Sequence, residues 1–246
     1  MVNVVTIGIG LQVTSETDVD VVRGPSCSGK TTATRILRQI LTHSVVIYQD
    51  DFYKASLKPE DKVPLHPETQ YGNWDCPESV DFDRMAAMID YVRTHQGCLP
   101  EDYDSNEENN VHDGSSLVSE STLASLKELL APFMKDHVFV FVDGFMLYYD
   151  DKVASQLNLK FQFTSDYQIV KERREKRQGY HTVEGYWVDP PGYFDKVVWP
   201  EHLRLTQYYH QSIQGLHQID TAKYSIDQTA LRVAHIIRDN TQCVSP

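Results

Sequence analysis

Short apolar runs alternate with amphipathic segments along most of the chain. Five runs are rich in branched and aromatic side chains, as is typical of strands buried on both faces of a parallel sheet. They cover residues 4–9, 44–49, 138–142, 159–163 and 216–219. Segments with helical spacing of apolar residues lie between them, notably 79–93 and 121–130. This alternation predicts an α/β fold in which helices cover both faces of a five-stranded parallel sheet.

The segment that follows the first predicted strand holds the most specific pattern in the chain. Residues 24–31 read G-x-x-x-x-G-K-T, the phosphate-binding loop of nucleotide kinases and hydrolases. In such a loop backbone N–H groups point at phosphate oxygens, Lys30 reaches the β- and γ-phosphates, and the Thr31 hydroxyl ligates Mg²⁺. We therefore expect a P-loop NTPase fold, with a helix beginning at the loop. The expected ATP contacts are Gly24, Ser26, Cys27, Ser28, Gly29, Lys30, Thr31 and Thr32.

The net charge and the cysteines indicate which ligands the protein binds and in which compartment it works. The 246 residues carry a formal net charge of −12, whereas a general nucleic-acid binder presents a basic face to the phosphate backbone. The four cysteines show no CxxC spacing and one of them lies inside the phosphate loop, which favours a reduced, cytoplasmic protein. No apolar run reaches the ~20 residues of a membrane helix, and no targeting signal is evident. We expect one domain with small-molecule ligands and neither nucleic acid nor membrane as partner.

Aspartates at the ends of two predicted strands are the candidate catalytic groups, because ligands of open α/β sheets bind outside the carboxyl ends of the strands. Asp143 follows the most strand-like run, where an acidic residue holds Mg²⁺; the alternative is a plain Asp-Gly turn. Asp50 and Asp51 end the second strand, either as solvated carboxylates or with one of them accepting the proton of a hydroxyl. Positioning dominates phosphoryl transfer, so a carboxylate of ordinary acidity suffices.

Two segments interrupt the strand and helix pattern. Residues 11–23 separate the first strand from the phosphate loop. One interpretation places a strand at 18–22, but its two aspartates would then be buried without partners, so we favour an insertion. Residues 99–119 are acidic and nearly devoid of apolar side chains, which predicts a mobile loop.

A basic cluster stands out in this acidic chain, at Lys171, Arg173, Arg174, Lys176 and Arg177. It is either a solvated helix face with ion pairs at i, i+4 spacing or part of a small arginine-rich lid over residues 167–195. We favour the lid, because arginine forks neutralise the charge that spreads during phosphoryl transfer.

Five segments together resemble the nicotinamide riboside kinases. They are DDFYK at 50–54, NWD at 73–75, VDGF at 142–145, RRxxR at 173–177 followed by Tyr180, and DPPGYFD at 189–195 with WP at 199–200. The resemblance runs in order from the phosphate loop to about residue 200. In that family the first strand runs almost directly into the phosphate loop, so residues 11–23 depart from its pattern.

The resemblance implies a kinase that uses ATP and Mg²⁺ to phosphorylate the 5′-hydroxyl of nicotinamide riboside, with nicotinic acid riboside as a second candidate substrate. The mononucleotide product would feed NAD synthesis. For the riboside it implies that Asp50 accepts the proton, with Asp51, Phe52 and Tyr53 beside it. Trp74 would contact the nicotinamide ring, and Asp75 and Arg174 would bind the ribose hydroxyls. Tyr180 and His181 would lie on the substrate side of the site. For the nucleotide and metal it implies Arg173 and Arg177 facing ATP, with Thr31 and Asp143 at Mg²⁺.

Three alternatives stay open at this point. A uridine or other nucleoside kinase would share the fold, but a neutral pyrimidine gains less from the face of Trp74 than a pyridinium cation does. Trp74 itself could be a buried anchor of its loop. A nucleotide-binding regulatory protein that has lost catalysis is the third, although Lys30, Asp50 and Asp143 are all present.

Deleting Leu11 to Arg23 tests the insertion hypothesis. The closure entropy of a long loop grows only logarithmically with its length, so the fold should tolerate the segment. The segment nevertheless separates the first glycine of the phosphate loop from the strand that would fix it. We expect the deletion to lower KM for ATP and raise kcat with an unchanged riboside preference. An insoluble variant, or one no better at using ATP, would show that these residues are integral to the fold.

Overall fold

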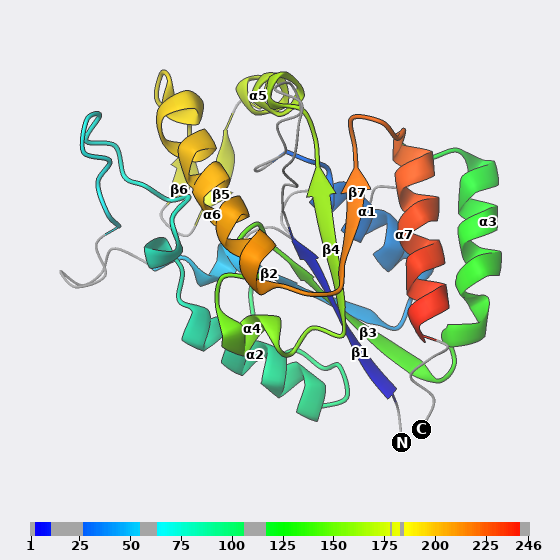
Figure 1. Cartoon of the computed structure of the whole chain (residues 1–246). Helices are drawn as coiled ribbons and strands as arrows, with labels where there is room; N and C mark the ends of the chain where they lie inside the picture. The colour runs from blue at the N-terminus through cyan, green and yellow to red at the C-terminus, as the bar shows by residue number, and fades with distance from the viewer. Residues whose placement is uncertain are drawn as a thin grey trace.

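A five-stranded parallel sheet forms the centre of the molecule (Figure 1). This computed structural model describes residues 3–10, 27–54, 63–105, 117–177, 179–182 and 185–241. The strands, in spatial order, are β2 (Ser44–Tyr48), β3 (His137–Asp143), β1 (Asn3–Gly10), β4 (Leu159–Thr164) and β7 (Leu216–Asp220). Each neighbouring pair is parallel. The predicted α/β architecture of a P-loop NTPase is confirmed.

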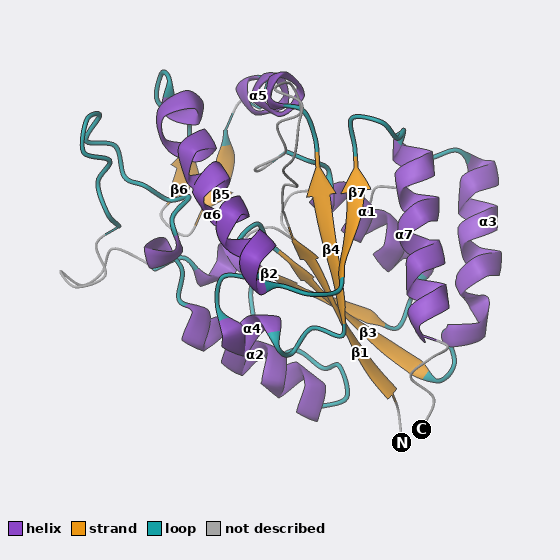
Figure 2. Ribbon diagram, in the orientation of Figure 1, coloured by secondary structure: helices purple, strands orange, loops and turns teal. Residues whose placement is uncertain are grey.

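Helices cover both faces of this sheet (Figure 2). On one face lie α1 (Lys30–Ile40), α3 (Glu120–Leu130) and α7 (Ile226–Thr241). On the other lie α2 (Phe82–Thr94), α4 (Asp151–Ala154) and α6 (Trp199–Ser212). Because strand side chains alternate between faces, Phe139 and Phe141 of β3 join the first core, and Val140 and Val142 join the second. The two cores hold the strand ends in fixed relative positions.

The remaining described elements lie at the carboxyl ends of the strands or in the connections. They are α5 (Tyr167–Glu175), the short helices η1 (Gln49–Phe52), η3 (Pro77–Ser79), η5 (Ala131–Phe133) and η6 (Phe194–Val198), and the antiparallel pair β5 (Tyr180–Thr182) and β6 (Gly185–Trp187). The hydrophobic pattern did not predict β5 and β6, because three-residue strands are too short to show an apolar run or a clear alternation. Among the described residues, no helix combines the length and the apolar character needed to cross a membrane.

The predicted strand 44–49 ends one residue early. Gln49 begins η1 instead, and its side chain is fully buried. Its Oε1 accepts a hydrogen bond of 2.8 Å from the backbone N–H of Met146, which follows β3. This side-chain bond therefore holds the chain where it leaves the sheet, directly before Asp50.

Parts of the segments that interrupt the pattern lie outside the described residues, namely 11–26 and 106–116. The described flanks of the acidic stretch 99–119 contact the rest of the fold. Leu99 and Tyr103 pack against the core on the α2 face, and Ser119 caps α3 by accepting a hydrogen bond from the N–H of Thr122 at 3.3 Å. The acidic stretch therefore begins and ends against ordered elements.

One carboxylate joins the starts of two helices. Asp227 in the first turn of α7 accepts bonds from the N–H of Ser119 at 2.9 Å and from its hydroxyl at 2.7 Å. Hydrogen bonds from the side chain of Thr122 and from Ser119 lower the pKa of Asp227 to about 2. Because this pKa lies below its unfolded value, the stabilisation is present at neutral pH and is lost as pH falls from about 4 through about 2.

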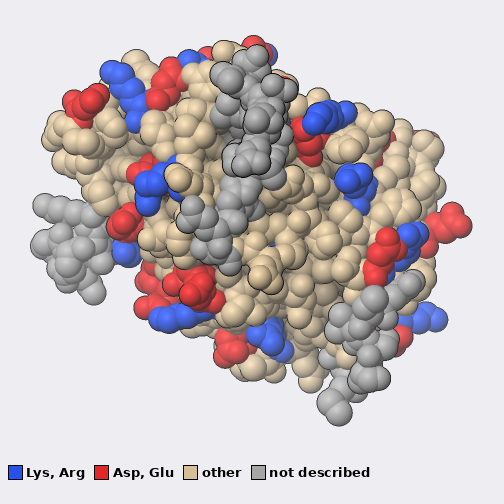
Figure 3. Space-filling model, in the orientation of Figure 1, with Lys and Arg blue, Asp and Glu red and all other residues tan. Residues whose placement is uncertain are grey.

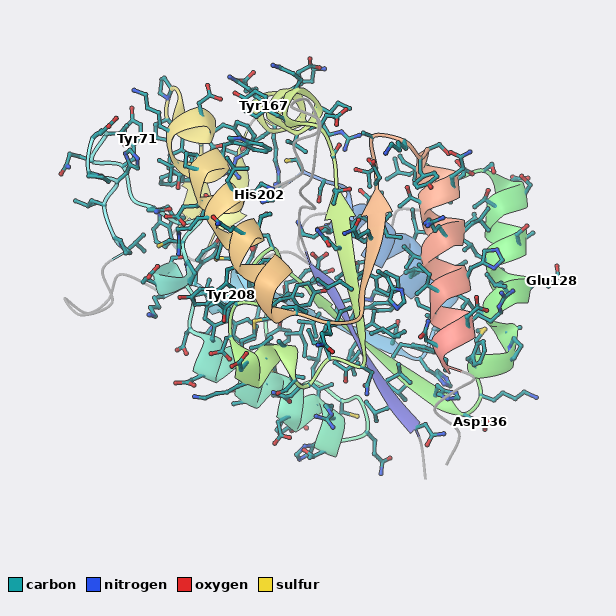
Figure 4. The ribbon with its side chains drawn as sticks, viewed as in Figure 1. Tyr71, Glu128, Asp136, Tyr167, His202 and Tyr208 are labelled. Carbon is teal, nitrogen blue, oxygen red and sulfur yellow. The ribbon has the colours of Figure 1, made fainter. Side chains whose placement is uncertain are left out.

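We expect Asp227→Ala to lower the free energy of unfolding at pH 7 by no more than about 1 kcal/mol, because the carboxylate is solvent-screened. Thermal unfolding followed by circular dichroism measures this, and the difference from the parent should shrink below pH 4. Glu128, which projects from α3 into solvent (Figure 4), provides the control Glu128→Ala. An equal loss in both variants would contradict a specific contact between α3 and α7.

Candidate active site

A cavity of about 450 Å³ opens at the carboxyl ends of the strands. The last residues of β2 and β3, Tyr48 and Asp143, line it together with Thr221, which follows β7. The end of the phosphate loop and the start of α1 form one wall, and α5 together with the residues directly after it contributes three arginines. This is the position at which open α/β sheets bind ligands.

The described part of the phosphate loop has the backbone conformation that a phosphate cradle requires. Cys27 and Gly29 both have positive φ, 76° and 96°, and α1 begins directly afterwards at Lys30. Thr221 fixes the loop from the opposite side, since its hydroxyl donates to the carbonyl of Ser28 at 2.9 Å. The loop therefore delivers Lys30 and the helix N-terminus into the cavity. Gly24 and Ser26 lie outside the described residues.

Lys30 and Asp143 are buried next to each other, with 7% and 5% of their surfaces exposed. Burial lowers the pKa of Lys30, while the charges of Asp143 and Asp50 oppose that shift. Burial raises the pKa of Asp143, while Lys30 and a hydrogen bond from the Thr31 side chain oppose it. Each ion is thus a partial counter-charge for the other.

The Asp143 carboxylate has capacity for a further ligand. Its Oδ2 is buried and has no hydrogen-bond partner in the described part of the chain. Buried carboxylate oxygens without a partner are rare in folded proteins. With the Thr31 hydroxyl bonded to the same carboxylate, the two groups supply oxygen donors of the kind that Mg²⁺ prefers.

The adjacent aspartates of η1 have different surroundings. Asp50 is exposed and lines the cavity. Asp51 is 6% exposed, is not among the lining residues, and accepts a 2.7 Å hydrogen bond from the Tyr103 hydroxyl. Phe52 is 1% exposed and belongs to the core on the α2 face. Of these three residues, only Asp50 is placed to meet a ligand directly.

The arginines of α5, and Arg177 directly after it, have two kinds of surroundings. Arg173 and Arg177 are exposed and line the cavity, and Arg173 also donates to the carbonyl of Cys27 at 3.3 Å. Arg174 is buried and forms a bidentate pair with Asp189, at 2.5 Å from Nε and 3.1 Å from a terminal nitrogen. Its guanidinium also lies 3.7 Å from Asp75. Burial raises the pKa of Asp75, and the charge of Arg174 opposes that shift.

A second acidic residue fixes the start of α5. Tyr167, the first residue of the helix (Figure 4), donates to Asp195 at 2.5 Å, and the Lys171 ammonium lies 2.6 Å from the same carboxylate. Asp195 and Asp189 both belong to the segment DPPGYFD. That segment therefore holds α5 at two points and sets the direction of its arginines.

An aromatic cluster adjoins the cavity. Trp74 is half-buried and is not a lining residue itself, but it makes an edge contact of 5.6 Å between ring centroids with Tyr53, which does line the cavity. Trp187 lies 6.4 Å from Trp74 and 5.8 Å from Tyr193. The indole N–H of Trp187 donates to Asp189 at 2.8 Å, which connects the cluster to the Arg174 pair.

Sequence reasoning missed several of these groups. Trp187, two residues before the segment DPPGYFD, could have been noted as a nearby aromatic. No motif marks Arg35, Tyr224, Ile226 or Thr229, which line the cavity because α7 begins beside α1. Thr32 lines it as expected from the loop. Tyr180 and His181 belong to β5, but the placement of their side chains is outside the described structure.

Comparison with known proteins identifies relatives over most of the chain. Residues 20–181 match the Phosphoribulokinase / Uridine kinase family. A protein from Schizosaccharomyces pombe named nicotinamide riboside kinase is 34% identical over 77% of this chain and 79% of its own length. Proteins of the same name from Eremothecium gossypii and Saccharomyces cerevisiae are 36% and 32% identical, over 74% and 73% of both chains. Together with a phosphate loop at the strand ends, these matches show that the chain belongs to the Phosphoribulokinase / Uridine kinase family, among the nicotinamide riboside kinases.

Proposed function

We propose that this enzyme transfers the γ-phosphoryl group of ATP to the 5′-hydroxyl of nicotinamide riboside. The observation that carries the proposal is that one cavity is lined by groups for both substrates. Lys30 and the phosphate loop line it and would face a nucleotide, whereas Asp50 and Asp75 line it and would face an acceptor. The product would be the mononucleotide used in NAD synthesis.

On the nucleotide side, Lys30, Arg173 and Arg177 would neutralise the phosphate oxygens. Their charge matters because phosphoryl transfer spreads negative charge over the transferred group. Thr31 and Asp143 would hold Mg²⁺, which when bound neutralises phosphate charge. The described side of the loop orients the phosphates through its backbone N–H groups.

On the acceptor side, Asp50 would accept the proton of the 5′-hydroxyl as the new bond forms. Asp75 and Arg174 would hold the ribose hydroxyls, since a carboxylate accepts both protons of a cis-diol and a guanidinium donates to their oxygens. Asp189 keeps Arg174 in place through its bidentate pair. The acceptor oxygen would then be held next to the phosphate loop. Holding the reacting groups in this orientation is the main source of the rate of such enzymes.

The aromatic cluster favours a cationic base. Nicotinamide riboside carries a pyridinium ring, which the face of an aromatic side chain attracts by ~0.5–2 kcal/mol. A neutral pyrimidine or nicotinic acid riboside, whose carboxylate offsets the ring charge, would gain less. Trp74, Tyr53 and Trp187 are the side chains from which this attraction would come.

The surface charge agrees with small-molecule substrates. In Figure 3, acidic and basic side chains are interspersed on the face that is drawn, without a continuous basic patch over its described residues. In the described part of the chain Cys27, Cys76 and Cys98 are free thiols. A thiol inside the phosphate loop suits a reducing, cytosolic setting.

Replacing Asp50 tests its proposed role as proton acceptor. We expect Asp50→Asn to lower kcat by ~10² or more, the usual scale for loss of a general base, with ATP binding nearly unchanged. Steady-state kinetics and calorimetric titration with ATP measure the two effects. Asp90→Asn, on an exposed position of α2, is the matched control. Turnover by Asp50→Asn within a few-fold of the parent would contradict the assignment.

Replacing Trp74 tests the basis of substrate choice. Trp74→Leu keeps an apolar side chain but removes the ring quadrupole. We therefore expect kcat/KM for nicotinamide riboside to fall more than that for uridine, by up to ~2 kcal/mol in free energy. Because both substrates are measured on one variant, any loss of folded protein cancels. Equal losses would show that Trp74 only anchors its loop.

A further inference from the structure

The turn that carries Asp50 is held on both sides by contacts with other parts of the fold. Helix η1 has only four residues, too few for a regular hydrogen-bond ladder. Directly before Asp50, the buried Gln49 is bonded to the N–H of Met146 at 2.8 Å. A Cβ atom on Gly144 would lie 2.5 Å from the Oε1 of Gln49, so this contact requires glycine at that position.

Directly after Asp50, Asp51 is bonded to two different segments. The Tyr103 hydroxyl donates to its Oδ2 at 2.7 Å, and the guanidinium of Arg84 donates to its backbone carbonyl. Arg84 comes from the first turn of α2 and lies over the ring of Phe52, 4.9 Å from its centroid. The backbone on both sides of Asp50 is therefore attached to packed parts of the fold.

We propose that Tyr103 is a positioning residue for phosphoryl transfer, because its hydrogen bond holds the Asp51 carboxylate away from the cavity and keeps Asp50 directed at the acceptor hydroxyl. The inference rests on the proposed role of Asp50. It assigns different tasks to two adjacent, chemically identical side chains. If Asp51 were released, its carboxylate would compete for the acceptor hydroxyl from an unproductive position.

The chemistry of the pair suits this task. Burial and the charge of Asp51 raise the pKa of Tyr103 well above its ordinary value, so the phenol stays a hydrogen-bond donor throughout the neutral range. A neutral donor to a carboxylate forms a charge-assisted bond, which is stronger than one between neutral groups. Tyr103 makes this contact across 52 residues of sequence. Through Asp51, Tyr103 therefore connects the turn that carries Asp50 to the segment that follows α2.

The test is Tyr103→Phe, which keeps the ring and removes only the hydroxyl. We expect kcat for nicotinamide riboside to fall by about 10-fold, because small displacements of a reacting group reduce rates by up to ~10². KM for ATP should stay within twofold, since Tyr103 is not among the residues that line the cavity. The number of ADP molecules formed per mononucleotide should rise above the parent value, because water would accept some of the phosphoryl groups in place of the riboside and release them as inorganic phosphate. Loss of folded protein would lower both products in proportion and leave that ratio unchanged.

The control is Tyr91→Phe. Tyr91 is an exposed residue of α2 whose ring stacks on His95, with 3.8 Å between the ring centroids. This variant should match the parent in kcat and in the product ratio. A double-mutant cycle adds a second measurement. Asp51→Ala and Tyr103→Phe remove the same bond, so the double variant should lose no more kcat than the more impaired single variant. Losses that multiply would overturn the proposal.

Two outcomes separate this inference from the assignment of the base. If Tyr103→Phe retains kcat within twofold while Asp50→Asn loses ~10², the positioning role is overturned and the base assignment stands. If both variants stay close to the parent, Asp50 is not the base and the positioning proposal fails with it. A fall in kcat at constant KM for ATP, with a raised product ratio, supports the proposal.

Discussion

The burial of Lys30 beside Asp143 is the interaction on which the rest of the site depends. Removing an ion from water costs several kcal/mol unless a partner compensates. Parallel strands that end at one edge of the sheet, and a helix that begins there, force these two charges into the same small volume. Each offsets part of the cost for the other, but one oxygen of Asp143 keeps no hydrogen-bond partner within the described structure. A phosphate and its cation would complete this arrangement, because they would supply the partners that the fold itself leaves out.

The same principle explains how α5 is held. Arg173 on α5 and Arg177 directly after the helix are exposed at the cavity, so they cannot anchor the helix in a core and other residues must fix it. Asp189 binds Arg174, and Asp195 binds Lys171. Both carboxylates come from one short segment, which therefore positions the arginines although none of its residues lines the cavity. The Trp187 bond to Asp189 extends this support to the aromatic cluster, so that the nucleotide side and the acceptor side share a single anchor.

The fold could be predicted because its determinants are local. Apolar runs marked the five strands, helical spacing marked α1, α2 and α3, and strand ends located Asp50 and Asp143. The division of labour between Asp50 and Asp51 could not be predicted, because a turn of the 3₁₀ type sends adjacent side chains in different directions and only the partner decides which is buried. That partner, Tyr103, lies in a stretch whose composition indicated nothing but a loop. The pair β5 and β6 was missed because strands of three residues are too short to leave a hydrophobic pattern.

The central claim is that one cavity joins ATP to a cationic riboside. It is tested most directly by incubating the purified chain with ATP and Mg²⁺ against a panel of nicotinamide riboside, nicotinic acid riboside and uridine, and by measuring mononucleotide and ADP formation for each. We expect 5′-mononucleotide from nicotinamide riboside, one ADP per product, and a higher kcat/KM than for uridine. Preference for uridine, or ATP binding without phosphorylation of any riboside, would contradict it.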